Sequence, residues 1–399
     1  MRPFARMSAF VLVLAVTPSL LAQIEIETLE GRHVGDLASI DGTAISIVVG
    51  GKQVTVPLVQ VVSIHQPGSD QSAGLVRFDL LGGDRYFGTL VQCDGLNTLV
   101  IDSPSCGRVE LRGELLVGIE YPMDRKDVEK LPPPEAVEGD AIFLRNGDRV
   151  RGQLEDLTAR EGGAFRYRIK TGDEVQEIDD LRVWRVKIVP VESFTPSGEF
   201  HAVVRCWDGT SLAARLKGVV DRTLVLDSIA GGLERKIPFG AIASILFMNG
   251  SFVYVPDLTP LATDHVPYIE DANKSIELRF EPRMNQCQRG GPLVLRGRTY
   301  RKGIGMQVRT RMDFDATGFA KFRCQVGIDD CAGDGGSVVF RVLLDGKKVK
   351  ETGILRGGGE VETLSIDLKG AKVLSLEVDH ADNSHVNDQA DWVDPILVR

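Results

Sequence analysis

The chain has 399 residues, a formal net charge of −9 and 43 glycines. Its length predicts two or more domains. Its acidic residues are spread along the chain and leave no basic patch, which argues against nucleic acid as a partner. Turn residues recur about every ten positions, valine is abundant and helical signals are scarce, so we expect an all-β protein.

The first 22 residues predict a signal peptide. Arg2 and Arg6 precede an apolar run from Ala9 to Val16, and the small residue Ala22 follows. The run is too short to span a bilayer, and no later stretch is long and apolar enough to do so. We expect cleavage after Ala22, giving a protein without a membrane span that is secreted, periplasmic or at the cell surface.

From Ile24 to about Gly250 one sequence unit recurs four times. The units open with IEIETLEGRHVGDL, VRFDLLGGDRYFGTL, AIFLRNGDRVRGQL and AVVRCWDGTSLAARL, and each closes on an apolar stretch with spaced hydrophobic residues. The same turn position is held by Gly31, Gly83, Gly147 and Gly209. Such short-stranded units suit small twisted barrels or propeller blades, and their pattern resembles Sm-like or SH3-like barrels.

The last third of the chain alternates apolar and polar residues on both sides of the segment DDCAGDGG, Asp329 to Gly336. This period of two predicts two half-buried antiparallel strands joined by a Gly/Asp turn. The alternating apolar residues are Phe322, Cys324, Val326 and Ile328, then Val338, Phe340, Val342 and Leu344.

The ordered series YRKGIG, VGIDD, GGSVVFRVLLDGK and a late ADW resembles NPCBM, the carbohydrate-binding module found on family 98 glycoside hydrolases, over roughly residues 265–399. The resemblance implies a galactose-binding-like β-sandwich, a jelly roll of two antiparallel sheets whose end loops bind ligand. The family commonly has a histidine soon after KGIG. Here Met306 and Gln307 occupy that place.

These observations predict the domain organisation. Because the triple proline Pro132 to Pro134 imposes an extended spacer, it divides the repeats two and two, and we expect barrels to pack in pairs. The predicted segments are a signal peptide at 1–22, two small β-barrel-like repeats at 23–125, a Pro-rich linker at 126–139, two further repeats at 140–254, and the NPCBM-like β-sandwich at 255–399.

Two groups of side chains are candidates for ligand binding. A polar loop near the end of the chain could exchange hydrogen bonds with sugar hydroxyls, although a solvated loop of turn-forming residues explains the same pattern. Trp392 in ADWVD could stack on a sugar, or it could pack in the core. The loop candidates are His380, Asp382, Asn383, His385 and Asn387.

A structural calcium ion is the one cofactor that the sequence suggests. Acidic side chains suit this hard cation, and the alternative is that they cap turns through their own backbone. The candidate ligands are Asp329, Asp330, Asp334, Asp391 and Asp394.

Six cysteines in an exported chain could form disulfides. Cys93 with Cys106, Cys324 with Cys331, and Cys206 with Cys287 are the pairs that sequence position suggests. Six reduced, buried thiols are the alternative, because a disulfide needs two Cα atoms within about 7 Å.

No catalytic motif is evident. The sequence shows no G-x-S-x-G elbow, no P-loop and no dinucleotide fingerprint, and the adjacent Asp329 and Asp330 would point to opposite faces of a strand. We therefore expect a secreted, non-catalytic protein that recognises a glycan or a glycosylated surface. The alternatives are an exported scaffold that binds other exported proteins and, third, a hydrolase accessory or cryptic hydrolase.

Overall fold

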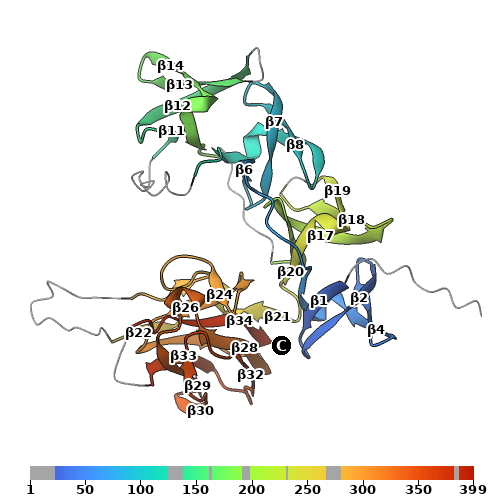
Figure 1. Cartoon of the computed structure of the whole chain (residues 1–399), viewed down its shortest axis with the longest axis vertical. Helices are drawn as coiled ribbons and strands as arrows, with labels where there is room; N and C mark the ends of the chain where they lie inside the picture. Colours follow the sequence, from blue (N-terminus) through green and yellow to red (C-terminus); the bar gives the residue numbers. More distant parts are fainter. Residues whose placement is uncertain are drawn as a thin grey trace, which may run out of the picture. The chain divides into compact units, whose positions relative to one another are not determined.

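The computed structural model describes residues 23–124, 138–160, 164–190, 198–230, 232–266, 280–381 and 386–399. Within these ranges the chain forms antiparallel strands joined by turns and short 3-10 helices, which confirms the predicted all-β class. It divides into two compact units, Met1–Ser197 with His201–Phe247, and Gly198–Phe200 with Met248–Arg399 (Figure 1). The predicted signal peptide lies outside the described residues. Among those described, no helix is long and apolar enough to cross a membrane.

The described part of the first unit contains four small barrels of one topology. In each, the first four of five consecutive strands pair in order, the fifth pairs with the first, and a 3-10 turn lies between the fourth and fifth. The turns are η1 (Leu58–Gln60), η2 (Gly113–Leu115), η4 (Asp180–Arg182) and η5 (Phe239–Ala241).

The strands of the four barrels are as follows. Barrel 1 contains β1 (Gln23–Thr28), β2 (Arg32–Ile40), β3 (Ala44–Val49), β4 (Lys52–Pro57) and β5 (Val61–His65). Barrel 2 contains β6 (Val76–Leu80), β7 (Arg85–Asp94), β8 (Thr98–Ser103), β9 (Gly107–Arg112) and β10 (Leu116–Glu120). Barrel 3 contains β11 (Asp140–Leu144), β12 (Arg149–Ala159), β13 (Phe165–Thr171), β14 (Glu174–Asp179) and β15 (Val183–Lys187). Barrel 4 contains β16 (His201–Cys206), β17 (Ser211–Val220), β18 (Thr223–Ser228), β19 (Glu234–Pro238) and β20 (Ile242–Met248).

The second strand of every barrel carries a bulge where its register with the third strand shifts. A bulge bends a long strand and increases its twist, so one strand can run along both halves of a small closed sheet. The repeated glycine occupies the turn that precedes this strand in all four barrels, as the sequence repeat predicted. The bulges lie at Leu37/Ser39, Leu90/Gln92, Leu154/Asp156 and Leu216/Gly218.

The barrels join through their last strands. β10 pairs with β15, with Ile119 opposite Val186, and β5 pairs with β20, with Ile64 opposite Ile245. Barrel 2 is therefore joined to barrel 3 and barrel 1 to barrel 4. The expectation that the proline linker separates two pairs of consecutive barrels was wrong, because the first pairing crosses that linker and the second joins the first and last repeats.

Barrels 2 and 4 also dock through two buried aspartates that bind reciprocally. Asp84 of barrel 2 accepts hydrogen bonds from the Ala213 N–H at 2.7 Å and the Ser228 hydroxyl at 2.8 Å. Asp208 of barrel 4 accepts from the Ser105 N–H at 2.9 Å and the Ser103 hydroxyl at 3.2 Å. The two serine hydroxyls end corresponding strands, β18 and β8.

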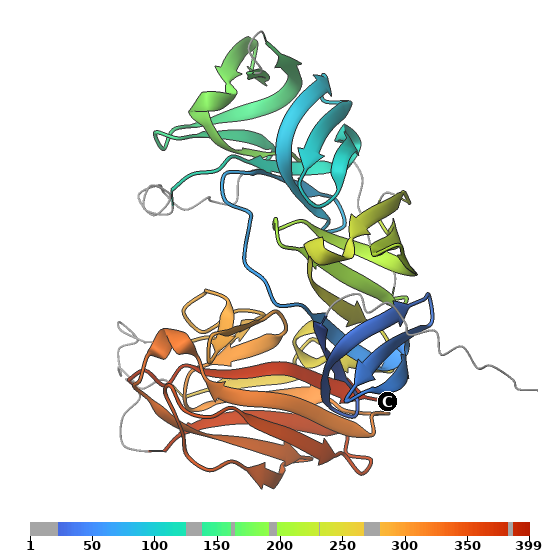
Figure 2. The same ribbon diagram turned by 45° about the vertical axis from the view of Figure 1, so that its right-hand side comes forward.

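The connection from barrel 1 to barrel 2 runs along barrel 4 (Figure 2). The Gln66 side chain donates to the Phe239 carbonyl at 2.9 Å, and the Gln71 N–H donates to the Trp207 carbonyl at 2.7 Å. The backbone of Gly68 packs directly against the Trp207 ring. A Cβ atom at this position would be only 2.4 Å from ring atom Cε2.

The second unit is a sandwich of two antiparallel sheets. The first sheet has the order β23-β26-β34-β28-β32, with β21 also on β34, and the second has the order β22-β27-β33-β29-β30, with β31 on β29. First-sheet strands are β21 (Phe252–Tyr254), β23 (Arg283–Met284), β26 (Gly303–Met306), β28 (Lys321–Ile328), β32 (Glu362–Asp367) and β34 (Ala390–Val398). Second-sheet strands are β22 (Ala262–His265), β27 (Thr310–Asp315), β29 (Ser337–Leu344), β30 (Lys347–Glu351), β31 (Leu355–Arg356) and β33 (Val373–His380). The 3-10 turn η6 (Val255–Asp257) follows β21.

The core lies between these sheets, and every alternating apolar residue predicted on β28 and β29 contributes to it. The ring of Trp392 meets Phe340 edge-to-face at 5.0 Å between centroids. The two strands belong to different sheets, however, so the expected Gly/Asp turn is not a hairpin. It crosses between the sheets and contains the 3-10 turn η7 (Asp330–Ala332).

A second, smaller core covers the outer face of the first sheet. The hairpin of β24 (Leu293–Leu295) and β25 (Arg298–Tyr300) packs with Cys287 and Val393, the residue after Trp392 on β34. Gly305 on β26 allows this cover to approach, because a Cβ atom there would meet the Gln286 carbonyl at 2.4 Å.

Substitution of Gly68 should destabilise the first unit. In Gly68→Ala the added methyl group cannot fit against the Trp207 ring, and overpacking of this kind costs about 1–3 kcal/mol. We expect a lower urea midpoint by tryptophan fluorescence. Gly240→Ala is the matched control, since a Cβ atom at that glycine meets nothing within 4 Å. Equal midpoints for the two variants would contradict the contact.

The stability of the first unit should depend on Asp84. Burial raises its pKa to about 6 from 3.8, and the hydrogen bonds from Ala213 and Ser228 offset this only in part. Between about pH 4 and pH 6 the folded protein binds a proton that the unfolded chain releases, so stability falls as pH rises through this window. Above it the ionised carboxylate costs about 3 kcal/mol.

Asp84→Asn keeps the shape and removes this charge. We therefore expect a higher urea midpoint than wild type at pH 8 and a similar midpoint at pH 4. Asp221→Asn, at an exposed position of the same unit, controls for loss of a negative charge. A wild-type advantage at pH 8 would overturn the assignment of the cost to Asp84.

Candidate functional site

Charged side chains cover the outer face of the second sheet of the sandwich. On β27 and β33 the inward residues are apolar, so the alternate residues point outward. The guanidinium of Arg341 on β29 donates to Glu377 and Asp379, each at 2.8 Å, and to Glu351 at 2.5 Å. These three carboxylates hold the pKa of Arg341 above its usual value, chiefly through the hydrogen bonds with Glu377 and Glu351.

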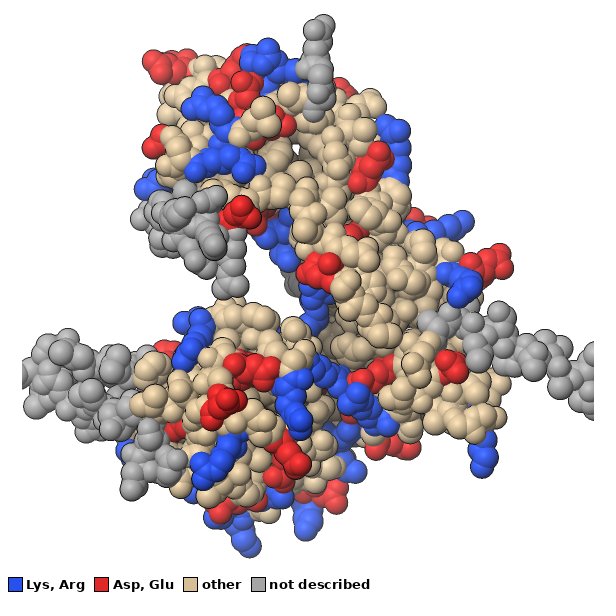
Figure 3. Space-filling view, in the orientation of Figure 1, with Lys and Arg blue, Asp and Glu red and all other residues tan. Residues whose placement is uncertain are grey.

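One end of this charged face is hollowed into a cleft of about 230 Å³. It contains three carboxylates and two guanidinium groups, which together offer both acceptors and donors to a ligand rich in hydroxyl groups. Figure 3 shows both signs of charge interspersed over the visible faces of the molecule. The cleft is lined by Asp264, Val266, Arg309, Thr310, Arg311, Glu377, Val378 and Asp379.

The polar loop begins beside this cleft. His380 is exposed, and its Nδ1 lies 3.3 Å from Oδ1 of Asp379, a cleft residue. Asn387 is half-buried, and its amide oxygen accepts from Arg289 at 3.3 Å. The other three candidates, Asp382, Asn383 and His385, lie outside the described residues.

Trp392 is not available to stack on a sugar. Its side chain is 0% exposed and packs between the sheets with Phe322 and Phe340. Since Trp392 lies on the inward side of the central strand β34, the packing alternative is the one that the structure supports.

The five aspartates suggested for calcium do not form one cluster. Asp330 accepts from the N–H groups of Arg296 and Gly297 at 2.8 and 2.7 Å, Asp334 is exposed, and the Asp394 N–H donates to the Lys302 carbonyl. Of the five, Asp329 and Asp330 act on the charge of the buried Asp391, Asp329 more strongly. The calcium hypothesis stays a prediction.

Asp329 and Asp391 lie under the cover of the first sheet, beside two thiols. Burial raises the pKa of Asp391 well above its usual value, and Asp329 raises it further. Burial likewise raises the pKa of the Cys331 thiol, and Asp329 adds to the shift. In the described structure neither carboxylate oxygen of Asp391 accepts a hydrogen bond from a donor group.

None of the three suggested cysteine pairs is bonded. All six cysteines are described as free thiols, which is the alternative that the sequence left open. Cys324 points into the main core, whereas Cys331 packs with the outer cover near Cys287. The Cys93 thiol donates to the Leu157 carbonyl at 3.1 Å. No sequence pattern matches Cys287 with Cys331, because 43 residues and several strands separate them.

The cleft could have been found in part from sequence. Arg311, Glu377 and Asp379 occupy the polar positions of two alternating strands, and these positions face away from the core. The sequence does not show that β27 and β33 are neighbours, or that Asp264 and Arg309 lie beside them at one end. The observed strand pairing was needed to place these residues together.

The second unit is a β-sandwich with two antiparallel sheets around one core. Residues 253–398 match the model of the NPCBM/NEW2 domain, which confirms the family expected for this region.

Two curated proteins share part of this chain. One, from Renibacterium salmoninarum, is provisionally named an endo-alpha-N-acetylgalactosaminidase and is 33% identical over 104 residues, which are 26% of this chain and 7% of that protein. The other, alpha-1,3-galactosidase B from Akkermansia muciniphila, is 31% identical over 119 residues, which are 29% of this chain and 15% of that protein. The chain thus spans a small fraction of either relative.

Solved structures with similarity include two that contain CBM51 modules. The CBM51 from Clostridium perfringens GH95, in complex with methyl-galactose, has 22% identity and a TM-score of 0.32, covering 37% of this chain and 99% of that one. The tandem CBM51 modules of a family 98 glycoside hydrolase from Streptococcus pneumoniae have 13% identity and a TM-score of 0.31, covering 94% of this chain and 88% of that one.

Proposed function

We propose that this protein is exported and recognises glycans through its C-terminal sandwich, without catalysing their cleavage. The observation that carries the proposal is the match of residues 253–398 to the NPCBM/NEW2 domain. The two curated relatives are named for activity on galactose-type sugars, and each shares only a short segment with this chain. A shared segment of this size is typical of a targeting module attached to different proteins. Because both relatives are named for such sugars, galactose or N-acetylgalactosamine is the proposed ligand class.

The proposed binding site is the cleft at the end of the second sheet. Asp264 and Arg309 are exposed there, and Glu377 is held in place by Arg341. Carboxylate and guanidinium groups form strong, directional hydrogen bonds with neutral hydroxyls. Only two of the eight residues that line the cleft are apolar, so we expect shallow binding in which hydrogen bonds set the orientation of the sugar.

The proposal is tested with a glycan array probed with the purified full chain, followed by calorimetric titration of the best ligand. We expect binding to glycans that end in galactose or N-acetylgalactosamine. The variant Asp264→Ala/Arg309→Ala removes two exposed polar groups of the cleft and should weaken binding by about tenfold or more, which corresponds to about 1.4 kcal/mol.

Asp367→Ala is the matched control. It removes an exposed aspartate from β32, on the other sheet, and should bind like wild type. If the folded wild-type protein bound no glycan, the proposed function would fail. If the cleft variant bound as tightly as the control, the cleft would be the wrong site while glycan recognition stood.

A further inference from the structure

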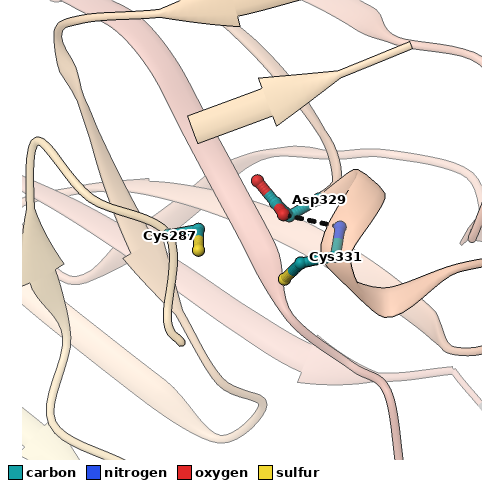
Figure 4. A group of neighbouring side chains, drawn as sticks. All are labelled: Cys287, Asp329 and Cys331. Atoms are coloured by element: carbon teal, nitrogen blue, oxygen red, sulfur yellow. Dashed lines mark hydrogen bonds between the residues drawn. The ribbon is translucent and has the colours of Figure 1, made fainter. Parts of the chain in front are cut away.

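Two thiols and two carboxylates meet beneath the cover of the first sheet. Cys287 Sγ, Cys331 Sγ and a carboxylate oxygen of Asp329 all lie within 4.8 Å of one another, and they come from two separate loops of the second unit (Figure 4). Asp329 follows β28, Cys331 lies in η7, and Cys287 lies in the loop after β23. Cys287 and Asp329 are 2% and 1% exposed.

The fourth group is Asp391, and it is the feature that needs explanation. Its side chain is 0% exposed on the central strand of the sheet, next to Asp329 and Cys287. Its strand neighbours in register are Gly305 and Gly327, which have no side chains to bind it. Neither of its oxygens accepts a hydrogen bond from a described donor, its carboxyl group lies in hydrogen-bonding reach of the Asp329 carboxyl group, and burial of two adjoining carboxyl groups is costly.

Asp329 is already fixed in position. One of its oxygens accepts from the Cys331 N–H and the other from the Val294 N–H, each at 2.8 Å. Hydrogen bonds to the backbone orient a carboxylate in the way that supporting groups orient metal ligands. Each oxygen keeps a second lone pair for a further interaction.

We propose that Cys287, Cys331, Asp329 and Asp391 bind one divalent cation of the zinc class. Four groups match the coordination number that this ion adopts in structural sites. Two thiolates select a borderline-soft cation over calcium, which takes oxygen ligands. Binding would release the thiol protons, and any proton on Asp391, to solvent.

A disulfide between Cys287 and Cys331 is the competing explanation, because export would favour oxidation. A disulfide would use both sulfur atoms and leave Asp391 to share a proton with Asp329 in a buried carboxyl pair. A cation gives the two thiols and Asp329 a common partner and places a positive charge beside the buried Asp391, which is why the geometry favours it.

The test uses the full chain, purified with a non-thiol reductant in metal-free buffer and titrated with Zn²⁺ and with Co²⁺. We expect one ion per chain by elemental analysis, and a thiolate-to-cobalt charge-transfer band in the near ultraviolet. Cys287→Ser and Cys331→Ser should each abolish the band. Asp391→Asn should weaken Zn²⁺ affinity by at least the roughly 10- to 100-fold that loss of a supporting group costs.

Cys93→Ser is the matched control, since this half-buried thiol belongs to the first unit. It should keep both the stoichiometry and the band. The proposal is overturned if the wild-type chain binds no stoichiometric zinc, if Cys287→Ser keeps the cobalt band, if calcium binds in preference to zinc, or if peptide mapping of the exported protein shows Cys287 bonded to Cys331. If a variant fails to fold, the zinc titration of the wild-type chain still tests the proposal.

Discussion

The alternation of side chains along the central strand β34 is the constraint on which the sandwich depends. Trp392 points inward and fills the space between the sheets, while Asp391 and Val393 point outward under the second core. Because successive side chains of a strand face opposite sides, a slip of one residue would place a carboxylate in the main core and an indole under the cover. The same register therefore sets both the hydrophobic core and the acidic cluster.

Sheet continuation organises the first unit in a comparable way. In barrels 1 and 2 the last strand pairs with the first along one side, which leaves its other side for pairing with a neighbouring barrel. The pairings β5 with β20 and β10 with β15 use those edges, and the buried aspartates of barrels 2 and 4 connect the two pairs. Spatial neighbours therefore differ from sequence neighbours, with barrel 1 beside barrel 4.

The sequence correctly predicted the features that depend on the local periodicity of side chains. The strands around Phe322 and Phe340 and the repeated glycine turn follow from alternation and turn chemistry, and the resemblance to NPCBM implied the β-sandwich of the C-terminal region. It failed where contacts join distant segments. Cys324 and Cys331 are close in sequence and were therefore suggested as a pair. Alternation on β28 directs Cys324 into the main core, however, and the chain then brings Cys331 to the outer face of the first sheet. Likewise, nothing local to Asp84 indicates that its partners are Ala213 and Ser228.

The two proposed sites of the sandwich use different sheets and do not depend on each other. The cleft lies on the outer face of the second sheet, where exposed charges from β22, β27 and β33 can exchange hydrogen bonds with a ligand. The cysteine and aspartate cluster lies under the cover of the first sheet and involves the connection that leads from β28 to β29. A cation there would fix the cover and that connection to the central strand, and so would stabilise the fold that presents the cleft without contacting the ligand itself.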